Sequence, residues 1–383
     1  MRVAIDAHMV GMRETGNEVY ITNLIRALQS MEMPDIEFVI LQTARSESPL
    51  DPARPAENFR VVRVIPANSF VRIPWSIPRQ VRRKQVDVLH MTYNAPPWLS
   101  SSALVVSVHD LAYRLYPQYY SPRARLILSL LIPLSIRRAE RVTTLSENSR
   151  QDIVREYGLS ADKIVVTSAA ASPEFQVVED RRRLGAVRAR YGLRESFVLA
   201  VGNLEPRKNL SGLVRAYAAL RQSGAISQQL VIVGQAHWQG SAVSAEVKKL
   251  GLSREVVFTG YVPIDDLVML YNAATVFVYP SLYEGFGLPI LEAMSCGTPV
   301  ITSNLASIPE VAGEAALLVS PQSEEDLAQV LGRVLVDESL RHKLREKGLR
   351  QAAQFSWGKT AHRLLEAYKD AMISHKNRRS RRR

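Results

Sequence analysis

The sequence contains a single cysteine, Cys296, in 383 residues. One cysteine excludes a disulfide within the chain, and this composition fits a reducing compartment. Two interpretations of the residue stay open: a catalytic thiol, or a small buried residue at the end of a helix.

Long apolar runs are also missing. The most apolar helical stretch, residues 126–136, is shorter than the roughly 20 apolar residues that cross a bilayer. The N-terminal segment MRVAIDAHMV has the pattern of a strand rather than that of a secretory signal. We therefore expect a cytoplasmic protein, with peripheral attachment to the inner face of the plasma membrane as a further candidate.

Acidic residues are in the minority, with 37 Asp and Glu against 49 Lys and Arg and a net charge of +12. This balance favours anionic partners such as nucleic acid, acidic lipid or phosphorylated small molecules. Basic runs occupy residues 79–84 and 137–141, and residues 376–383 are predicted to form a disordered basic tail. Because arginines flank the apolar stretch 126–136, it is interpreted either as a contact with an anionic membrane surface or as an ordinary core helix.

Apolar strands alternate with amphipathic helices along most of the chain. In the first half, strands are predicted near residues 2–8, 36–42, 59–65, 86–91, 103–111, 140–146 and 162–168. After a polar, irregular stretch the alternation resumes, with strands near residues 196–203, 228–235, 255–262, 275–281, 298–304 and 315–320. Strands that are apolar throughout are typical of a parallel sheet that helices cover on both faces.

The sequence therefore predicts an α/β fold of two doubly wound domains in series, residues 1–172 and 173–357, with a ligand cleft between the carboxyl ends of their strands. A C-terminal helix at about 358–375 is a candidate to pack back on the first domain. Many functions use this architecture, so it decides none of them by itself.

The segment EGFGLPILE places Glu284 and Glu292 on either side of a glycine-containing turn and a predicted helix start, with Glu292 expected on the first helical turn. Glycines let the backbone approach a ligand closely, and a helix start offers free N–H groups to an anion such as a diphosphate. Phosphate repels a carboxylate, so each glutamate is better matched to sugar hydroxyls. A ligand with a polyol on each side of a diphosphate is a nucleotide sugar. The alternative is that Glu292 only favours the helix dipole and that Glu284 is a surface residue.

Arg207 and Lys208 lie in a loop that follows a predicted strand. When a nucleoside diphosphate departs, negative charge grows on the leaving phosphate, and two cations can stabilise it. The sequence has no Asp-x-Asp metal motif and no Gly-x-Gly-x-x-Gly dinucleotide fingerprint. These two residues are therefore candidates to stabilise the leaving group, and the alternative is a solvated basic loop.

EGFGLPILE resembles the signature of retaining glycosyltransferases of family 4, which have the GT-B fold of two Rossmann-like domains with an interdomain cleft. AVGNLEPRKNL, FTGYVPIDDLVMLYNAATVFVYPS, GTPVITSN and VSVHDL are similar to other segments of the family, and the resemblance is densest from residue 196 to residue 321. It implies a retaining, metal-independent transfer of a hexose from GDP-mannose or a UDP-sugar to a hydroxyl of a glycan or glycolipid acceptor. It implies no cofactor and no nucleic-acid partner.

The resemblance also implies roles for particular residues. The catalytic candidates are His109, Arg207, Lys208 and Glu284, of which His109 is expected to bind the transferred sugar, often at its 6-hydroxyl in the family. The donor-binding candidates are Gly16, Asn17, Gly202, Asn203, Val262, Phe286, Gly287, Leu288 and Glu292. From the residues themselves, Asp110 is expected to orient His109 or to cap the following loop. His8, at the end of the first strand, is a weaker candidate, and His90, which also ends a strand, is expected to be structural or near the acceptor.

The segment TGNEVY departs from the family pattern of a glycine-rich loop followed by a basic residue. Asn17 takes part of that place and could hydrogen-bond phosphate or acceptor, so the departure leaves the acceptor open. Two other functions also fit the architecture: a nucleotide-sugar epimerase, and a non-catalytic subunit that binds a nucleotide sugar.

Overall fold

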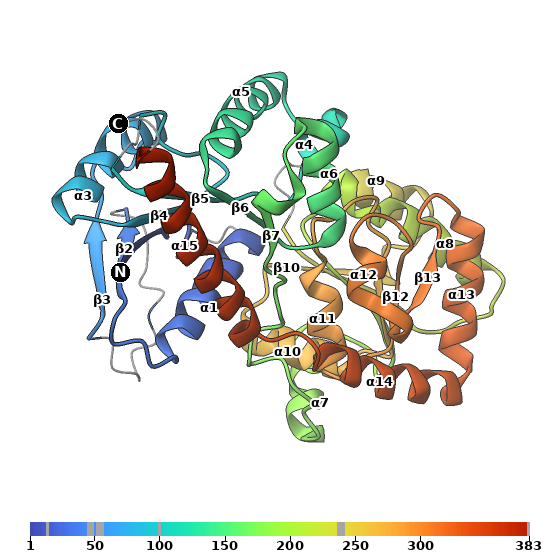
Figure 1. The fold of residues 1–383 in the computed structure, drawn as a ribbon. Coiled ribbons are helices and arrows are strands. Elements are labelled where there is room, and N and C mark those ends of the chain that lie inside the picture. Colours follow the sequence, from blue (N-terminus) through green and yellow to red (C-terminus); the bar gives the residue numbers. More distant parts are fainter. Residues whose placement is uncertain (13–14, 44–49, 51–56, 99–100, 236–241, 381–383) are drawn as a thin grey trace. The chain divides into compact units, whose positions relative to one another are not determined.

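A computed structural model of the chain describes residues 1–12, 15–43, 50, 57–98, 101–235 and 242–380 (Figure 1). The chain forms two compact units, which we call unit 1 (residues 1–169 and 356–383) and unit 2 (residues 170–355). The expected domains ended at residues 172 and 357. The C-terminal segment thus belongs to the unit that contains the N-terminus.

Unit 1 has, within the described residues, a seven-stranded parallel sheet in the order β3-β2-β1-β4-β5-β6-β7. Its strands are β1 (Arg2–Asp6), β2 (Glu37–Gln42), β3 (Phe59–Arg63), β4 (Val88–Thr92), β5 (Ala103–Ser107), β6 (Arg141–Thr144) and β7 (Ile164–Val166). Its helices are α1 (Thr15–Gln29), α2 (Ser69–Val71), η1 (Arg72–Ser76), α3 (Ile77–Arg83), α4 (Ala112–Leu115), η2 (Pro117–Tyr119), α5 (Pro122–Arg138), α6 (Glu147–Tyr157), η3 (Ala161–Lys163) and α15 (Trp357–Ser380).

Unit 2 has a six-stranded parallel sheet in its described part, in the order β10-β9-β8-β11-β12-β13. Its strands are β8 (Phe197–Val201), β9 (Gln229–Val233), β10 (Val256–Gly260), β11 (Val276–Tyr279), β12 (Val300–Ser303) and β13 (Leu317–Val319). Its helices are α7 (Arg181–Arg190), η4 (Pro206–Lys208), α8 (Leu210–Gln222), α9 (Ala242–Lys249), α10 (Ile264–Ala273), α11 (Leu288–Ser295), α12 (Ile308–Ala312), η5 (Gly313–Ala315), α13 (Glu324–Val336) and α14 (Glu338–Ala352).

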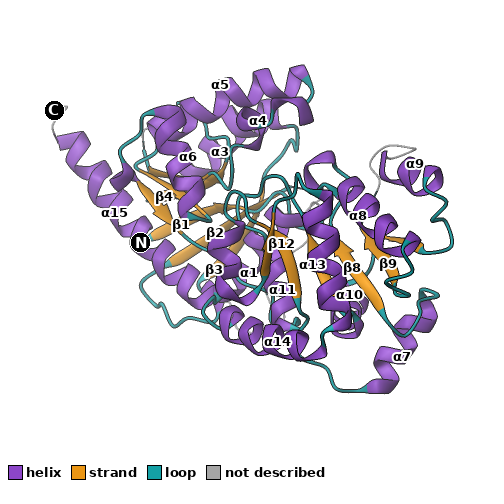
Figure 2. Ribbon diagram, turned by 90° about the vertical axis from the view of Figure 1, so that its right-hand side faces the viewer, coloured by secondary structure: helices purple, strands orange, loops and turns teal. Residues whose placement is uncertain are grey.

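Helices cover both faces of the unit 1 sheet, which is why its central strands are apolar throughout (Figure 2). One core cluster joins Leu89 of β4 and Val106 of β5 to Ile77 of α3 and Ile132 of α5. Helices α1 and α15 pack together and α15 contacts β5. The predicted α/β class with two doubly wound parallel sheets is confirmed.

Helix ends follow local rules where the sequence offers a cap. The Ser146 side chain accepts a hydrogen bond from Ser149 N at the start of α6, and Gly158 ends that helix with a left-handed φ of 62°. Cys296 is buried and lies at the C-cap of α11, which favours the structural interpretation of this thiol.

Two expectations for the irregular segments are wrong. The stretch between the two alternating regions was expected to be irregular, but it contains α7, whose start is capped by the Asp180 side chain. Residues 376–383 were expected to form a disordered basic tail, but α15 continues to Ser380, and residues 381–383 lie outside the described part of the chain.

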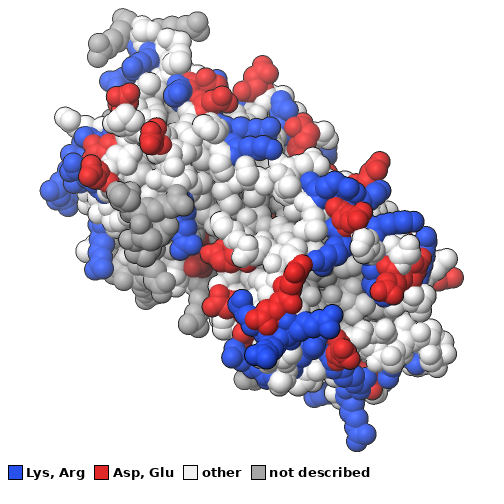
Figure 3. All heavy atoms as spheres, turned by 90° about the horizontal axis from the view of Figure 1, so that it is seen from below, with Lys and Arg blue, Asp and Glu red and all other residues white. Residues whose placement is uncertain are grey.

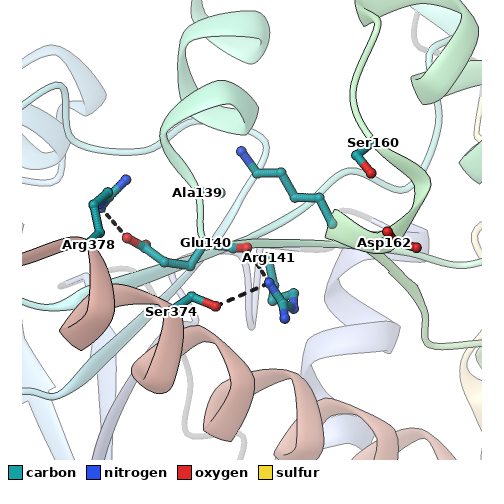
Figure 4. A pocket seen from close by; sticks show the side chains of 8 residues that line it. Ala139, Glu140, Arg141, Ser160, Asp162, Ser374 and Arg378 are labelled. Carbon is teal, nitrogen blue, oxygen red and sulfur yellow. Dashed lines mark hydrogen bonds and ion pairs between the residues drawn. The ribbon is translucent and has the colours of Figure 1, made fainter. Parts of the chain in front are cut away.

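Helix α15 continues because its last turns are anchored on unit 1. His375 Nδ1 lies 3.1 Å from Glu140 Oε1, and Arg378 also pairs with Glu140. Glu140 and Arg378 border a pocket of about 380 Å³ in which Arg141 also reaches Ser374 (Figure 4). None of the expected site residues lines this pocket.

Candidate active site

Two loops of unit 2 begin side by side at one edge of its sheet. Strands β8 and β11 are neighbours and run parallel, so their carboxyl ends meet at the same edge. The loop after β8 contains Gly202 and Asn203 and leads into η4, which carries Arg207 and Lys208. The loop after β11 carries Glu284 and leads into α11. The topology therefore joins segments that lie far apart in the sequence.

Glu284 forms ion pairs with both cations. Its Oε2 lies 2.8 Å from Arg207 Nη1 and its Oε1 lies 2.7 Å from Lys208 Nζ. Adjacent side chains in a loop need not point the same way, but here both point to one carboxylate. We call Arg207, Lys208, Glu284 and Tyr279 the charge cluster.

Tyr279, the last residue of β11, completes this cluster. Lys208 Nζ donates a hydrogen bond to the Tyr279 hydroxyl at 2.6 Å, and that hydroxyl donates to Glu284 Oε1 at 2.9 Å. The ammonium group also lies 5.0 Å from the centre of the Tyr279 ring. The tyrosine thus fixes the position of the lysine and of the carboxylate together.

Burial and charge oppose each other in the cluster. Burial by itself raises the pKa of Glu284, but the charges of Arg207 and Lys208 outweigh it and lower the pKa to about 2. Burial lowers the pKa of Lys208, and Glu284 partly offsets this. With one carboxylate and two cations, the ionised cluster has a net charge of about +1 and can attract a phosphate group.

Arg207 also holds the loop that carries Glu284. Its Nη1 donates a hydrogen bond to the Tyr283 carbonyl at 2.7 Å, and the Arg207 carbonyl accepts one from Leu282 N at 2.9 Å. Ser307 supports the same loop, because its hydroxyl donates to the carbonyls of Glu284 and Phe286. Arg207 therefore contributes a charge and also sets the backbone geometry of the site.

Two glycines let the neighbouring loops approach each other. A Cβ atom at Gly234, which follows β9, would lie 2.0 Å from the Gly202 carbonyl oxygen, and Gly234 has a φ of 150°. A Cβ atom at Gly202 would contact the Lys208 side chain at 3.5 Å. No other residue fits at 234 without moving the backbone that supports Lys208.

Glu292 lies apart from the charge cluster, in the helix that follows the second loop. The Gly287 backbone, with a left-handed φ of 104°, starts α11 at Leu288. Glu292 therefore begins the second turn of the helix, whereas the sequence placed it on the first. The Tyr271 hydroxyl donates to Glu292 Oε2 at 2.9 Å, and burial raises the pKa of Glu292 to about 7.

His109 follows β5 in unit 1 and is held by α1. Its Nδ1 lies 2.6 Å from Asn17 Oδ1. Because an amide oxygen only accepts hydrogen bonds, Nδ1 carries the proton and Nε2 presents a lone pair. The buried Nε2 has no hydrogen-bond partner among the described residues. Burial lowers the pKa of His109 to about 3, so the ring is neutral at physiological pH.

The chain is similar to known glycosyltransferases in sequence and in structure. The description "Glycosyltransferase Family 4" matches residues 15–175, and "Glycosyl transferases group 1" matches residues 188–351. The structure of a sucrose-phosphate synthase from Thermosynechococcus elongatus superposes with a TM-score of 0.77 at 23% identity, over 96% of this chain and 98% of that one. O-antigen chain mannosyltransferase B of Escherichia coli is 36% identical over 266 residues, which are 69% of this chain and 70% of that protein.

The chain belongs to the GT-B superfamily of glycosyltransferases. A longer relative, the serotype-specific mannosyltransferase WbdA of Escherichia coli, is 34% identical over 60% of this chain but over only 29% of its own length. This glycosyltransferase therefore spans less than a third of that protein.

Several residues that were expected to bind the donor have buried or half-buried side chains. Phe286 is buried against Phe355, with ring centres 5.8 Å apart, and Val262 is buried as well. Leu288 is the first residue of α11 and is half-buried. For the first two residues, the groups that can reach a donor are those of the backbone.

The remaining candidates of unit 1 occupy different environments. Gly16 lies in the first turn of α1 with open space around it, so only a close ligand would require glycine there. Asp110 accepts a hydrogen bond from Ala112 N, which agrees with a cap of the following loop, and Asn17 is the residue that orients His109. His90 is buried between Tyr368 and Ser107, and burial lowers its pKa to about 4, which fits a structural residue.

Sequence reasoning missed three residues of this glycosyltransferase that the structure places in or beside the site. Tyr279 and Tyr271 gave no signal, because a tyrosine in an apolar strand or helix is equally typical of the core. Gly234 did give one, since it follows an apolar strand in the same way as Gly202. Within the described residues there is no group of three or more His, Cys, Asp or Glu that could hold a metal ion.

Proposed function

We propose that this glycosyltransferase is a retaining hexosyltransferase of family 4 that transfers a hexose from a nucleoside-diphosphate sugar to a hydroxyl of a glycan or glycolipid. The observation that carries the proposal is the charge cluster, with two cations and a carboxylate at the carboxyl ends of β8 and β11. GDP-mannose is the first donor to test, because two relatives are named as mannosyltransferases. A UDP-sugar is the second.

The cluster suits a diphosphate next to a sugar. Arg207 and Lys208 are mostly buried, and charges interact more strongly in such a site than they do in water. A bound diphosphate would share the two cations that Glu284 now occupies. The carboxylate is then free to accept hydrogen bonds from hydroxyls of the transferred sugar, which do not repel it.

Glu292 suits the ribose. It is buried, and among the described residues its Oε2 accepts a hydrogen bond from the Tyr271 hydroxyl. The vicinal hydroxyls of a ribose would supply donors to the other carboxylate oxygen. Ionisation of Glu292 above pH 7 would strengthen these hydrogen bonds, because charged acceptors bind hydroxyls more strongly.

The reaction would take place on one face of the sugar. The bond from the anomeric carbon to the phosphate oxygen breaks, the acceptor oxygen forms the new bond on the same side, and its proton moves to the leaving phosphate. Arg207 and Lys208 stabilise the charge that grows on that phosphate, a task that metal ions perform in other enzymes. Retention of configuration and independence of a metal ion are both parts of this proposal.

His109 would bind the sugar from unit 1. Its neutral Nε2 is an acceptor held in place by Asn17, and a sugar hydroxyl is a matching donor. Gly202, Asn203 and Gly16 would bring backbone N–H groups near the phosphates. For a lipid-linked acceptor, peripheral attachment to the cytoplasmic side of a membrane would place the enzyme near its substrate. No helix in the described part of the chain is long and apolar enough to span a bilayer.

The test is transfer from radiolabelled GDP-mannose and UDP-glucose to a lipid extract and to soluble mannosides, with and without EDTA. We expect a new glycosidic bond, an α-linked product by NMR, and undiminished activity in EDTA. Lys208→Met should lose most of the activity, and Glu195→Gln, at an exposed position of unit 2, serves as the matched control. Altered free donor without a product would indicate an epimerase. Donor binding without any turnover would indicate a non-catalytic subunit.

A further inference from the structure

The pocket of unit 1 that Figure 4 shows lies at the edge of the sheet opposite to His109. β6 begins at Arg141 and β7 begins at Ile164, so the pocket borders the amino ends of these strands, where η3 and the last turns of α15 meet. His109 follows β5, a parallel neighbour of β6, at the carboxyl edge of the same sheet. The pocket is therefore separate from the residues to which the transfer reaction is assigned.

Three cations line the pocket, and they come from three separate elements. Arg141 starts β6, Lys163 ends η3, and Arg378 lies in the last turn of α15. Like charges repel each other, so gathering them costs free energy unless an anion compensates them. Arginine and lysine side chains that converge in this way are typical of sites that bind phosphate.

The neighbouring carboxylates compensate these cations only in part. Glu140 is turned away toward α15 and β5, because its Oε1 pairs with His375 and Arg378. Its Oε2 accepts a backbone hydrogen bond from β5 at 2.7 Å. Arg141 pairs with Asp370 at 3.4 Å, but the Asp370 side chain is 54% exposed, and exposed ion pairs of this kind contribute little.

Lys163 has the weakest compensation of the three cations. Among the described residues it forms no ion pair, and its Nζ donates a hydrogen bond to the Arg137 carbonyl at 2.9 Å. Burial lowers the pKa of Lys163, an effect that Glu140 partly offsets, and the charges of Arg378 and Arg141 lower it further. On the face of the molecule drawn in Figure 3, by contrast, acidic and basic side chains are interspersed. A half-buried cation without a carboxylate partner favours an anionic ligand.

The opposite side of the pocket offers groups that suit hydroxyls. Ser160 and Asp162 lie together there, away from Arg378 (Figure 4). Asp162 is exposed and forms no ion pair within the described part of the chain. A carboxylate repels phosphate but accepts hydrogen bonds from hydroxyls. A pocket of about 380 Å³ has room for a small organic ligand, so a sugar phosphate matches both of its sides.

Helix α15 joins this pocket to the surroundings of His109. Its last turns supply Ser374 and Arg378 to the pocket. At its first residue, Trp357, the indole ring lies 5.7 Å from the Tyr20 ring, and the Tyr20 ring lies 4.7 Å from that of His109. A ligand that ties the end of α15 to β6 and η3 would therefore stabilise the helix that supports His109.

We propose that this pocket binds a small sugar phosphate, whose phosphate group contacts the three cations and whose hydroxyls donate to Asp162. Binding ties the end of α15 to the amino edge of the unit 1 sheet. The site takes no part in the transfer itself, and its binding does not rest on the proposed function.

The experiment is isothermal titration calorimetry of the full chain with mannose 6-phosphate and with inorganic phosphate, at constant ionic strength, with and without GDP. We expect one site per chain that binds mannose 6-phosphate more tightly than phosphate and that saturating GDP leaves unchanged. Lys163→Met and Arg141→Gln should each weaken binding about tenfold or more, because each removes a charge-assisted hydrogen bond. Asp162→Ala should weaken the binding of mannose 6-phosphate but not that of inorganic phosphate.

The matched control is Lys249→Met, which removes an exposed lysine of α9 in unit 2 and should bind the sugar phosphate as the wild type does. The substitutions at 141, 162 and 163 lie in different parts of the pocket wall, so a variant that fails to fold leaves the others to decide. No binding to the wild type, equal affinities of the wild type and Lys163→Met, or displacement of the sugar phosphate by GDP would overturn the proposal.

Vesicles that contain phosphatidic acid test a lipid source of the same phosphate chemistry. Binding to these vesicles without any binding of mannose 6-phosphate would also overturn the proposal. If mannose 6-phosphate binds as expected and GDP does not bind at all, the result counts against the proposed function and supports the pocket.

Discussion

Replacing each signature glutamate by glutamine should change the stability of unit 2 in opposite directions. Glu292 is a buried carboxylate whose pKa is raised to about 7, whereas an unfolded chain would ionise it near the ordinary value of 4.5. Between these pH values the folded state binds more protons, so stability falls as pH rises from 4.5 to 7 and stays constant above. The ionised group costs about 3 kcal/mol at pH 8, and Glu292→Gln removes this cost.

Ionised Glu284 has the opposite effect on stability, because it stabilises the folded state. Its pKa is lowered to about 2, so its stabilisation is present above pH 4.5 and is lost as pH falls toward 2. The difference between this pKa and the ordinary value of 4.5 corresponds to a stabilisation of about 3 kcal/mol at neutral pH. Glu284→Gln also removes the carboxylate that the two buried cations share and leaves Arg207 with the more distant Glu205, which typically costs a further few kcal/mol. The variant should therefore be less stable than the wild type throughout the range from pH 5 to 8.

The assay is thermal and urea unfolding of the wild type and both variants at pH 5, 6, 7 and 8, with Glu195→Gln as an exposed control. A change of 3 kcal/mol corresponds to a shift of about 6–12 °C in the melting temperature of a unit of this size. The gain in Glu292→Gln should shrink from pH 8 to pH 5, while the loss in Glu284→Gln should stay nearly constant. Shifts of the same sign in both variants, or a gain in Glu292→Gln that does not depend on pH, would refute the reasoning.

Three further experiments test the site. Lys208→Met should lower turnover about 10²–10³-fold, since it removes one leaving-group cation while Arg207 still pairs with Glu284; near-normal turnover would contradict this. Calorimetry should find that Glu284→Gln keeps or tightens the affinity for bare GDP, because its carboxylate competes for the same cations, whereas Glu292→Gln weakens it; equal losses would exclude this division of roles. Gly234→Ala should lower the melting temperature and the activity together, because its Cβ has no room, and a fully active, stable variant would show that the backbone adapts.

The local sequence predicted most of the helices and strands, because the pattern of apolar residues in each element reflects how that element is buried. A strand buried on both faces must be apolar at every position, so β4 and β5 could be read from composition alone. Helix α7 could not, since its arginine-rich segment has no apolar stripe and depends on the Asp180 cap and on packing against α10. The end of α15 could not be read either, because the partner of Arg378 is Glu140, more than 200 residues away.

In the candidate site, too, the sequence identified individual residues but not the contacts between them. Glu284, Glu292, Arg207 and Lys208 could be named from the sequence, because glycine turns and helix starts after apolar strands are local features. Their pairing could not, since it depends on β8 and β11 being neighbours in the sheet, and the same contacts give Tyr279 its role.

By itself, the sequence determined the fold class, the two parallel sheets and the type of chemistry, because hydrophobic period, turn residues and charge act over a few residues. Tertiary structure alone decided which charges meet, and with it the opposite pKa shifts of Glu284 and Glu292. It also decided which half of the apolar helix α5 faces the core and which half faces solvent. The physical reason is that burial and the distance between charges are properties of packing, and segments distant in the chain supply both.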